Sequence, residues 1–135
     1  MTPKERDKWI SESISYWRHE FRIPPDLELK VKYVTNRDED EDRKYATIAM
    51  GMVPYSKATL EIYDEVFAAK DFKDTADKAI CHEILHLALY PLVSYCNNIF
   101  VGDEGKQRHL EELEETVVTT LERACTNIAG RAKGQ

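Results

Sequence analysis

The sequence has few cysteines, no excess of positive charge and no long apolar run. Its 135 residues include 3 cysteines, and none of them forms the CxxC pair that binds zinc or exchanges disulfides. The 19 Lys and Arg are outnumbered by 25 Asp and Glu, and the formal charge of −6 repels a phosphate backbone. We therefore expect reduced thiols and no nucleic acid as a partner.

No segment predicts export or membrane insertion. Residues 1–8 are polar and charged, unlike the start of a signal peptide. The longest apolar run, 87–93, is far shorter than the roughly 20 residues that cross a bilayer. We expect a cytoplasmic protein without a membrane partner. With 42% hydrophobic residues, the chain can bury one core, so we expect a single domain over residues 1–135.

Helical spacing of apolar residues predicts three helices. The first begins with a Thr2-to-Glu5 capping box and must end before Pro24-Pro25, because proline removes a donor and disfavours helix in the residue before it. The last should stop at Gly130, a typical residue just past a helix end. The predicted helices cover Thr2 to Ile23, Asp71 or Asp74 to Tyr95, and Lys106 to Ile128.

Period-two alternation predicts a small, mostly antiparallel sheet between the first two helices, and hence an α+β fold. The predicted strands are Leu27 to Tyr33, Ala46 to Met52 and Ala58 to Tyr63. The charged run Asn36 to Lys44 repels itself, so we interpret it as a solvated hairpin loop rather than a cation site. We expect Ala58 to Tyr63 to be an edge strand that offers main-chain groups to an extended peptide.

The segment His82-Glu83-Ile84-Leu85-His86 carries the clearest chemistry. Residues four apart lie on one face of a helix, so His82 and His86 can bind one metal ion about 2 Å from each imidazole. Glu83 lies about 100° round the helix, where its carboxylate can accept a proton from the attacking water. The alternative is a chance match, but two histidines in a helix that is apolar nearly all round need partners. We therefore predict a zinc site here.

A catalytic zinc usually has a third protein ligand, which we expect from the last helix. Four glutamates lie there: Glu111, Glu112, Glu114 and Glu115. The face expected to pack inward is marked by Leu110, Leu113, Val117, Leu121, Ala124 and Ile128. Glu114 lies nearest to that face, so the sequence predicts Glu114 as the ligand, ahead of Glu115 and then Glu111.

Other polar residues carry less weight. His109 and His19 are interpreted as surface histidines, the second suited to the end of its helix. Three tyrosines are candidates for stabilising an oxyanion, although a tyrosine with a polar tip is common in cores, and the sequence does not choose among them. They are Tyr63, Tyr90 and Tyr95.

The chain resembles the small gluzincin-like metallopeptidases of phages and prophages. The resemblance rests on the order of the elements, on Ala79-Ile80-Cys81-His82-Glu83-Ile84-Leu85-His86-Leu87 and on Glu114-Glu115-Thr116-Val117-Val118, and it covers nearly the whole chain. It implies a zincin fold with Zn²⁺ bound by His82, His86 and Glu114 and with Glu83 as the base. It brings no substrate with it.

Three functions remain open at this point. The first is hydrolysis of peptide bonds in a peptide or an unfolded protein segment by a zinc metallopeptidase. The second is a regulatory or binding module that keeps zinc without turnover, since so short a chain has little sequence for deep specificity pockets. The third is hydrolysis of a non-peptide amide. The sequence does not determine the oligomeric state.

Overall fold

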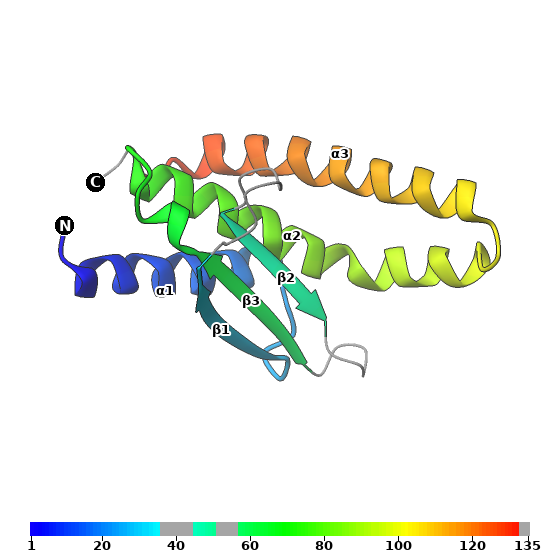
Figure 1. The fold of residues 1–135 in the computed structure, drawn as a ribbon, viewed down its shortest axis with the longest axis horizontal. Helices are drawn as coiled ribbons and strands as arrows, with labels where there is room; N and C mark the ends of the chain where they lie inside the picture. Colours follow the sequence, from blue (N-terminus) through cyan, green and yellow to red (C-terminus); the bar gives the residue numbers. More distant parts are fainter. Residues whose placement is uncertain (36–44, 51–56, 133–135) are drawn as a thin grey trace.

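The computed structural model describes residues 1–35, 45–50 and 57–132, and its fold is α+β, as predicted. Three helices pack beside a three-stranded sheet (Figure 1). The elements are α1 (Pro3–Glu20), β1 (Glu28–Val34), β2 (Ala46–Met50), β3 (Lys57–Tyr63), the 3-10 turn η1 (Asp64–Val66), α2 (Phe72–Ile99) and α3 (Glu104–Ala129). The predicted hairpin loop at 36–44 lies outside the described residues.

The helix ends follow the local signals, with two differences. Thr2 caps α1 through the predicted capping box, and Gly130 ends α3 in the left-handed conformation. The first helix ends at Glu20, earlier than expected, because Arg22 adopts a positive φ of 53° and Ile23 N–H returns to the Arg18 carbonyl. The second continues through Pro91 and ends at Ile99, four residues beyond the expected end.

The sheet is mixed, and this corrects two predictions. Its order is β1-β3-β2, with β3 parallel to β1 and antiparallel to β2. The prediction of a mostly antiparallel sheet is therefore wrong, and so is the prediction of Ala58 to Tyr63 as an edge. β3 is the central strand because it pairs with β1 on one side and with β2 on the other, and its residues Ala58, Leu60 and Ile62 are buried. The edges are β1 and β2.

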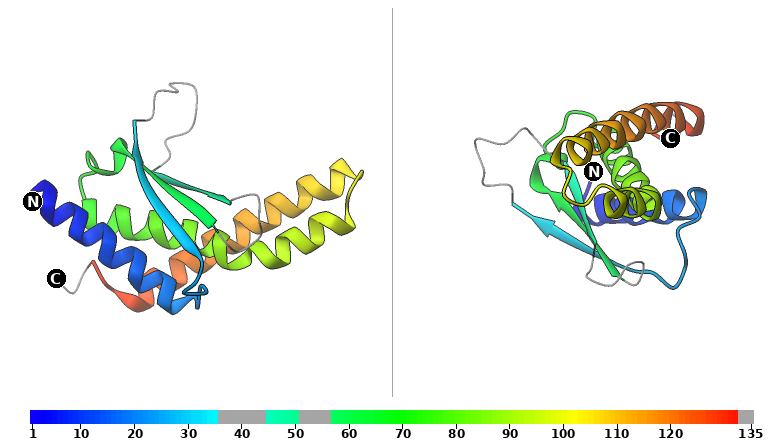
Figure 2. Two further views of the ribbon diagram at one scale, coloured as in Figure 1. Left: turned by 90° about the horizontal axis from the view of Figure 1, so that it is seen from below. Right: turned by 90° about the vertical axis from the view of Figure 1, so that its right-hand side faces the viewer.

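The core lies along α2, which packs against both α1 and the sheet. Trp9, Ile10, Ile14 and Trp17 of α1 join buried side chains of β3 and α2 in one hydrophobic cluster. Figure 2 shows the sheet on one side of the helices, and the α2–α3 hairpin extending beyond both the sheet and α1. By length and hydropathy α2 passes the criteria for a membrane-spanning helix, as the core helices of water-soluble proteins also do. The three cysteines are free thiols.

One buried carboxylate joins three parts of the chain. Asp77 of α2 is 3% exposed. Its Oδ1 accepts hydrogen bonds from Ser13 Oγ at 2.9 Å, Trp17 Nε1 at 2.9 Å and Arg131 Nε at 3.1 Å. The first two donors lie on α1 and the third follows α3. A buried charge is costly unless it is paired and hydrogen-bonded, and these three donors meet that requirement.

We predict that Asp77→Ala lowers the free energy of unfolding by roughly 3 kcal/mol or more, because Arg131, Ser13 and Trp17 would lose a shared acceptor in the interior. Urea unfolding followed by circular dichroism measures the change. The control is Glu12→Ala, which removes only an exposed ion pair with Lys8 at 3.9 Å. Equal losses in the two variants would contradict the role assigned to Asp77.

Candidate metal centre

The two histidines line a cleft and lie one helical turn apart on α2. The ring centroids of His82 and His86 are 5.0 Å apart, and both side chains are largely buried. The cleft has a volume of about 1000 Å³ and is bounded by α2, α3 and β2. The i, i+4 spacing thus turns both imidazoles into one cavity, as the sequence predicted.

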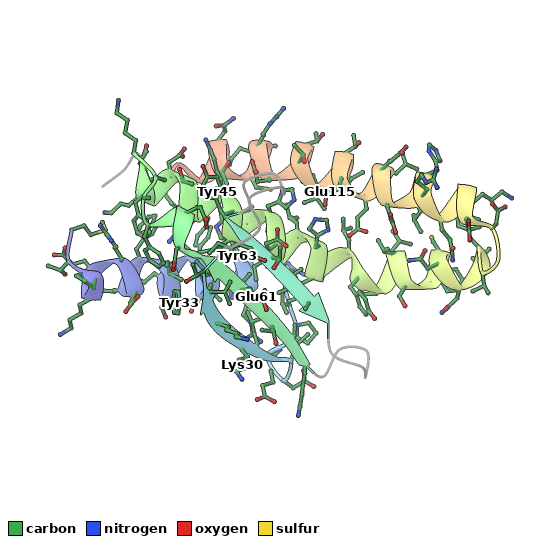
Figure 3. The ribbon with its side chains drawn as sticks, viewed as in Figure 1. Lys30, Tyr33, Tyr45, Glu61, Tyr63 and Glu115 are labelled. Atoms are coloured by element: carbon green, nitrogen blue, oxygen red, sulfur yellow. The ribbon has the colours of Figure 1, made fainter. Side chains whose placement is uncertain are left out.

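A carboxylate from α3 reaches both histidines. Glu115 Oε2 lies 3.3 Å from His82 Nε2, and Glu115 Oε1 lies 2.8 Å from His86 Nε2. One donor atom from each of these residues lies within 4.8 Å of the other two. Figure 3 shows Glu115 on the side of α3 that faces α2. Two imidazoles of α2 and one carboxylate of α3 therefore point toward the same place in the cleft.

The donor set fits zinc. Ligand atoms about 2 Å from a tetrahedral zinc lie about 3.3 Å from one another. The two distances between Glu115 and the histidines, 3.3 Å and 2.8 Å, are close to this value, and all three ligand atoms lie within 4.8 Å of one another. Two imidazole nitrogens and one carboxylate oxygen are a known ligand set of catalytic zinc, which leaves a fourth position open. His82, His86 and Glu115 are thus a possible metal-binding triad.

His86 has a carboxylate at each of its two nitrogens. Glu114 Oε2 lies 2.6 Å from Nδ1, and Glu115 Oε1 lies 2.8 Å from Nε2. A neutral imidazole has one N–H, so it can donate to only one of them. The other contact requires a cation, either a proton on the ring or a metal ion between Nε2 and Glu115. A metal would meet this requirement while Nδ1–H donates to Glu114.

The sequence analysis predicted Glu114 as the third ligand, whereas the possible metal-binding triad contains Glu115. Glu114 instead lies behind His86, in the position of a residue that orients a ligand. The reason is the rotation of α3. Val118 is the fully buried apolar residue of this helix, whereas Leu113, Val117 and Leu121 are exposed. The side expected to pack inward faces solvent, and this rotation turns Glu115 into the cleft.

Glu122 is a residue of the cleft that the sequence analysis missed. It lies seven residues, or two turns, beyond Glu115, and its Oε1 is 3.8 Å from His82 Nδ1. Burial raises the pKa of the Glu122 carboxyl, while nearby Lys78 opposes that shift. The i, i+7 spacing was the available signal, but it has meaning only once α3 is known to face the histidines.

Burial also acts on His82. Loss of solvation lowers the pKa of His82, and the neighbouring His86 lowers it further, although Glu115 opposes the shift. A lowered pKa keeps the imidazole neutral at neutral pH. Since only the neutral ring binds a metal, this shift prepares His82 to act as a ligand.

Glu83 lies in the same cleft and contacts the edge of the sheet. Its Oε2 accepts a hydrogen bond of 3.0 Å from the main-chain N–H of Ile48 in β2. Among the residues that the structure describes, β2 pairs only with β3, so this N–H belongs to the side of β2 that faces away from β3. The Glu83 carboxylate therefore joins α2 to β2, the strand that borders the cleft.

The remaining candidates are three tyrosines and two histidines. Tyr90 lines the cleft, whereas Tyr95 is exposed on the α2 part of the hairpin and Tyr63 contacts Thr47 Oγ1 at 3.3 Å. His109 is exposed and lies far from the histidine pair in sequence, as does exposed His19. Of the three tyrosines, Tyr90 alone is among the residues that line this cleft.

Comparisons with known proteins give no match: no protein-family model matches the chain, and neither does any curated protein or solved structure. The resemblance to gluzincin-like metallopeptidases therefore stays a prediction. The function has to be argued from the cleft itself.

Proposed function

We propose that this chain is a zinc-dependent metallopeptidase with His82, His86 and Glu115 as zinc ligands and Glu83 as general base. The observation that carries the proposal is the convergence of His82, His86 and Glu115, each of which offers a ligand atom within 4.8 Å of the other two. A base of the right type, Glu83, lines the same cleft from the same helix. The third support is a cleft of about 1000 Å³, within the range of pockets that hold ligands.

Each residue has a separate task in this proposal. Bound zinc would supply a Lewis acid that polarises the scissile carbonyl and makes water a better nucleophile. Glu83 takes the proton from the attacking water and passes it to the leaving amine. Glu114 holds His86 through Nδ1, so that Nε2 keeps its lone pair for the metal. The amide N–H of Ile48 holds Glu83 in place until substrate enters.

The edge of β2 is the proposed place for the substrate. Ile48 N–H already points into the cleft, so an extended peptide could pair with this strand as an added strand. Main-chain pairing favours unfolded segments over folded ones and demands few particular side chains. The predicted substrate therefore remains an extended peptide, but its partner is β2 in place of β3.

A zinc-binding module without turnover is the second candidate. The observation in its favour is that the Glu83 carboxylate is already engaged by Ile48 N–H. If substrate cannot displace this hydrogen bond, the base does not reach the attacking water. Zinc binding would then serve stability or recognition of a partner, without hydrolysis.

We expect the purified protein to bind about one zinc per chain, because two histidines and one carboxylate form a near-complete catalytic site. Glu115→Ala removes a proposed ligand and should abolish stoichiometric binding. Glu114→Ala removes an orienting partner and should weaken affinity by about 10- to 100-fold. Elemental analysis and chelator competition measure both. Exposed Glu112→Ala serves as the control. A larger loss in Glu114→Ala than in Glu115→Ala would restore Glu114 as the ligand.

We expect Glu83→Gln to keep zinc and lose hydrolysis by about 10²- to 10⁴-fold, because the amide keeps the shape and removes the proton acceptor. Turnover of casein, with and without a chelator, gives the rate, and elemental analysis gives the zinc content. If the unmodified protein binds zinc but leaves casein and short peptides intact, the module without turnover is the correct function. Loss of zinc in Glu83→Gln would instead make Glu83 a ligand.

A further inference from the structure

Most of the apolar side of α3 is exposed to solvent, with Leu110 half-buried at one end. We call Leu110, Leu113, Val117, Leu121, Ala124 and Ile128 the α3 stripe. Leu113, Val117, Leu121 and Ile128 are 48%, 44%, 39% and 87% exposed. The side of α3 that packs on α2 carries Glu114, Val118 and Glu122 instead. An amphipathic helix normally buries its apolar side, so the exposed stripe indicates a partner.

The spacing of the α3 stripe suits a second straight helix. Its members repeat every 11 residues, since Leu110 is followed by Leu121, Leu113 by Ala124, and Val117 by Ile128. An 11-residue period is 3.67 residues per turn, so the stripe stays on one side of the helix. It is about 27 Å long at 1.5 Å per residue. One flank is formed by Thr116, Thr120 and Asn127, so uncharged side chains border the stripe there.

The neighbouring helix carries a second exposed apolar group. Leu92, Tyr95 and Ile99 of α2 are 61%, 65% and 60% exposed and follow one another at helical spacing. The C-terminal part of α2, to which residues 92–99 belong, extends past α1 (Figure 2). Tyr95 is nine residues from His86, about 180° round α2, and Val117 is about 200° from Glu115 on α3. Both apolar surfaces therefore turn away from the metal centre.

We propose that this surface binds a second copy of the chain through an antiparallel, two-fold packing of the α3 helices. A two-fold interface pairs a surface with itself, so the contacts must be reciprocal. The α3 stripe meets that condition: with antiparallel helices centred near Thr119, Leu110 lies opposite Ile128 of the second copy, and Val117 lies opposite Leu121. The smaller Ala124 then falls near Leu113, which allows close packing.

The exposed area agrees with such a dimer. Burying a large apolar side chain removes roughly 100 Å² of apolar surface from water, so the four exposed members of the α3 stripe offer on the order of 200 Å². Eight partly exposed side chains of α2, the turn and α3 together offer on the order of 500 Å², so the interface has to include the end of α2 as well as the α3 stripe. A standard interface buries about 800 Å² per partner, of which about 65% is apolar in homodimers, or again roughly 500 Å². The eight are Leu92, Tyr95, Ile99, Val101, Leu113, Val117, Leu121 and Ile128.

Sedimentation equilibrium of the full chain over a wide range of concentrations tests this proposal. We expect a mass of twice 15.7 kDa for the unmodified protein and 15.7 kDa for Val117→Glu and for Leu121→Glu. Both substituted residues are exposed in the single chain, so helical content by circular dichroism should not change. The matched control is Arg108→Glu, an exposed position of α3 outside the α3 stripe, which should remain dimeric.

Three results would overturn the proposal: an unmodified protein that is monomeric at every concentration, a Val117→Glu,Leu121→Glu double variant that stays dimeric, or a dimer lost equally in Arg108→Glu. Because the α3 stripe lies away from the cleft, zinc binding is expected to be the same in the monomeric variants. The dimer and the metal centre can therefore fail independently of each other.

Discussion

The buried carboxylate of Asp77 is the constraint on which the arrangement of the helices depends. It binds two residues of α1 and one residue after α3, so it fixes one side of α2 against α1. His86 is nine residues further along, about 180° round the helix. Holding Asp77 inward therefore turns the histidines outward into the cleft. The hydrogen bonds to Asp77 therefore stabilise the core and also set the direction in which the two histidines point.

Two interactions favour different rotations of α3: burial of its apolar residues, and contact of its glutamates with the histidines. Packing alone would turn the apolar side of this helix inward, as its periodicity suggests. The structure instead turns Glu114, Glu115 and Glu122 toward the histidines, where three carboxylates surround two imidazoles. Such an arrangement is costly unless a cation balances it. Proposed zinc binding would supply that balance, and self-association would cover the apolar side left in water.

Local patterns in the sequence were sufficient for most of the fold. Thr2 and Gly130 mark helix ends because their preferences act within one turn of the chain. Strands near the predicted ranges followed from alternation, which is also local. Strand order did not follow, because the pairing of β1 with β3 is set by contacts between residues far apart in the sequence. The same limit applies to the length of α2, which continues through Pro91.

For the metal centre, the sequence alone determined that His82 and His86 share a face and that Glu83 flanks them, since a helix of fixed pitch leaves no alternative. Only the tertiary structure shows that Glu115, and not Glu114, joins His82 and His86 in a possible metal-binding triad. Neighbouring residues differ by about 100° round a helix, so the choice depends on how α3 is rotated against α2. That rotation is a balance of apolar packing against charge pairing between helices, and it cannot be read from one helix alone.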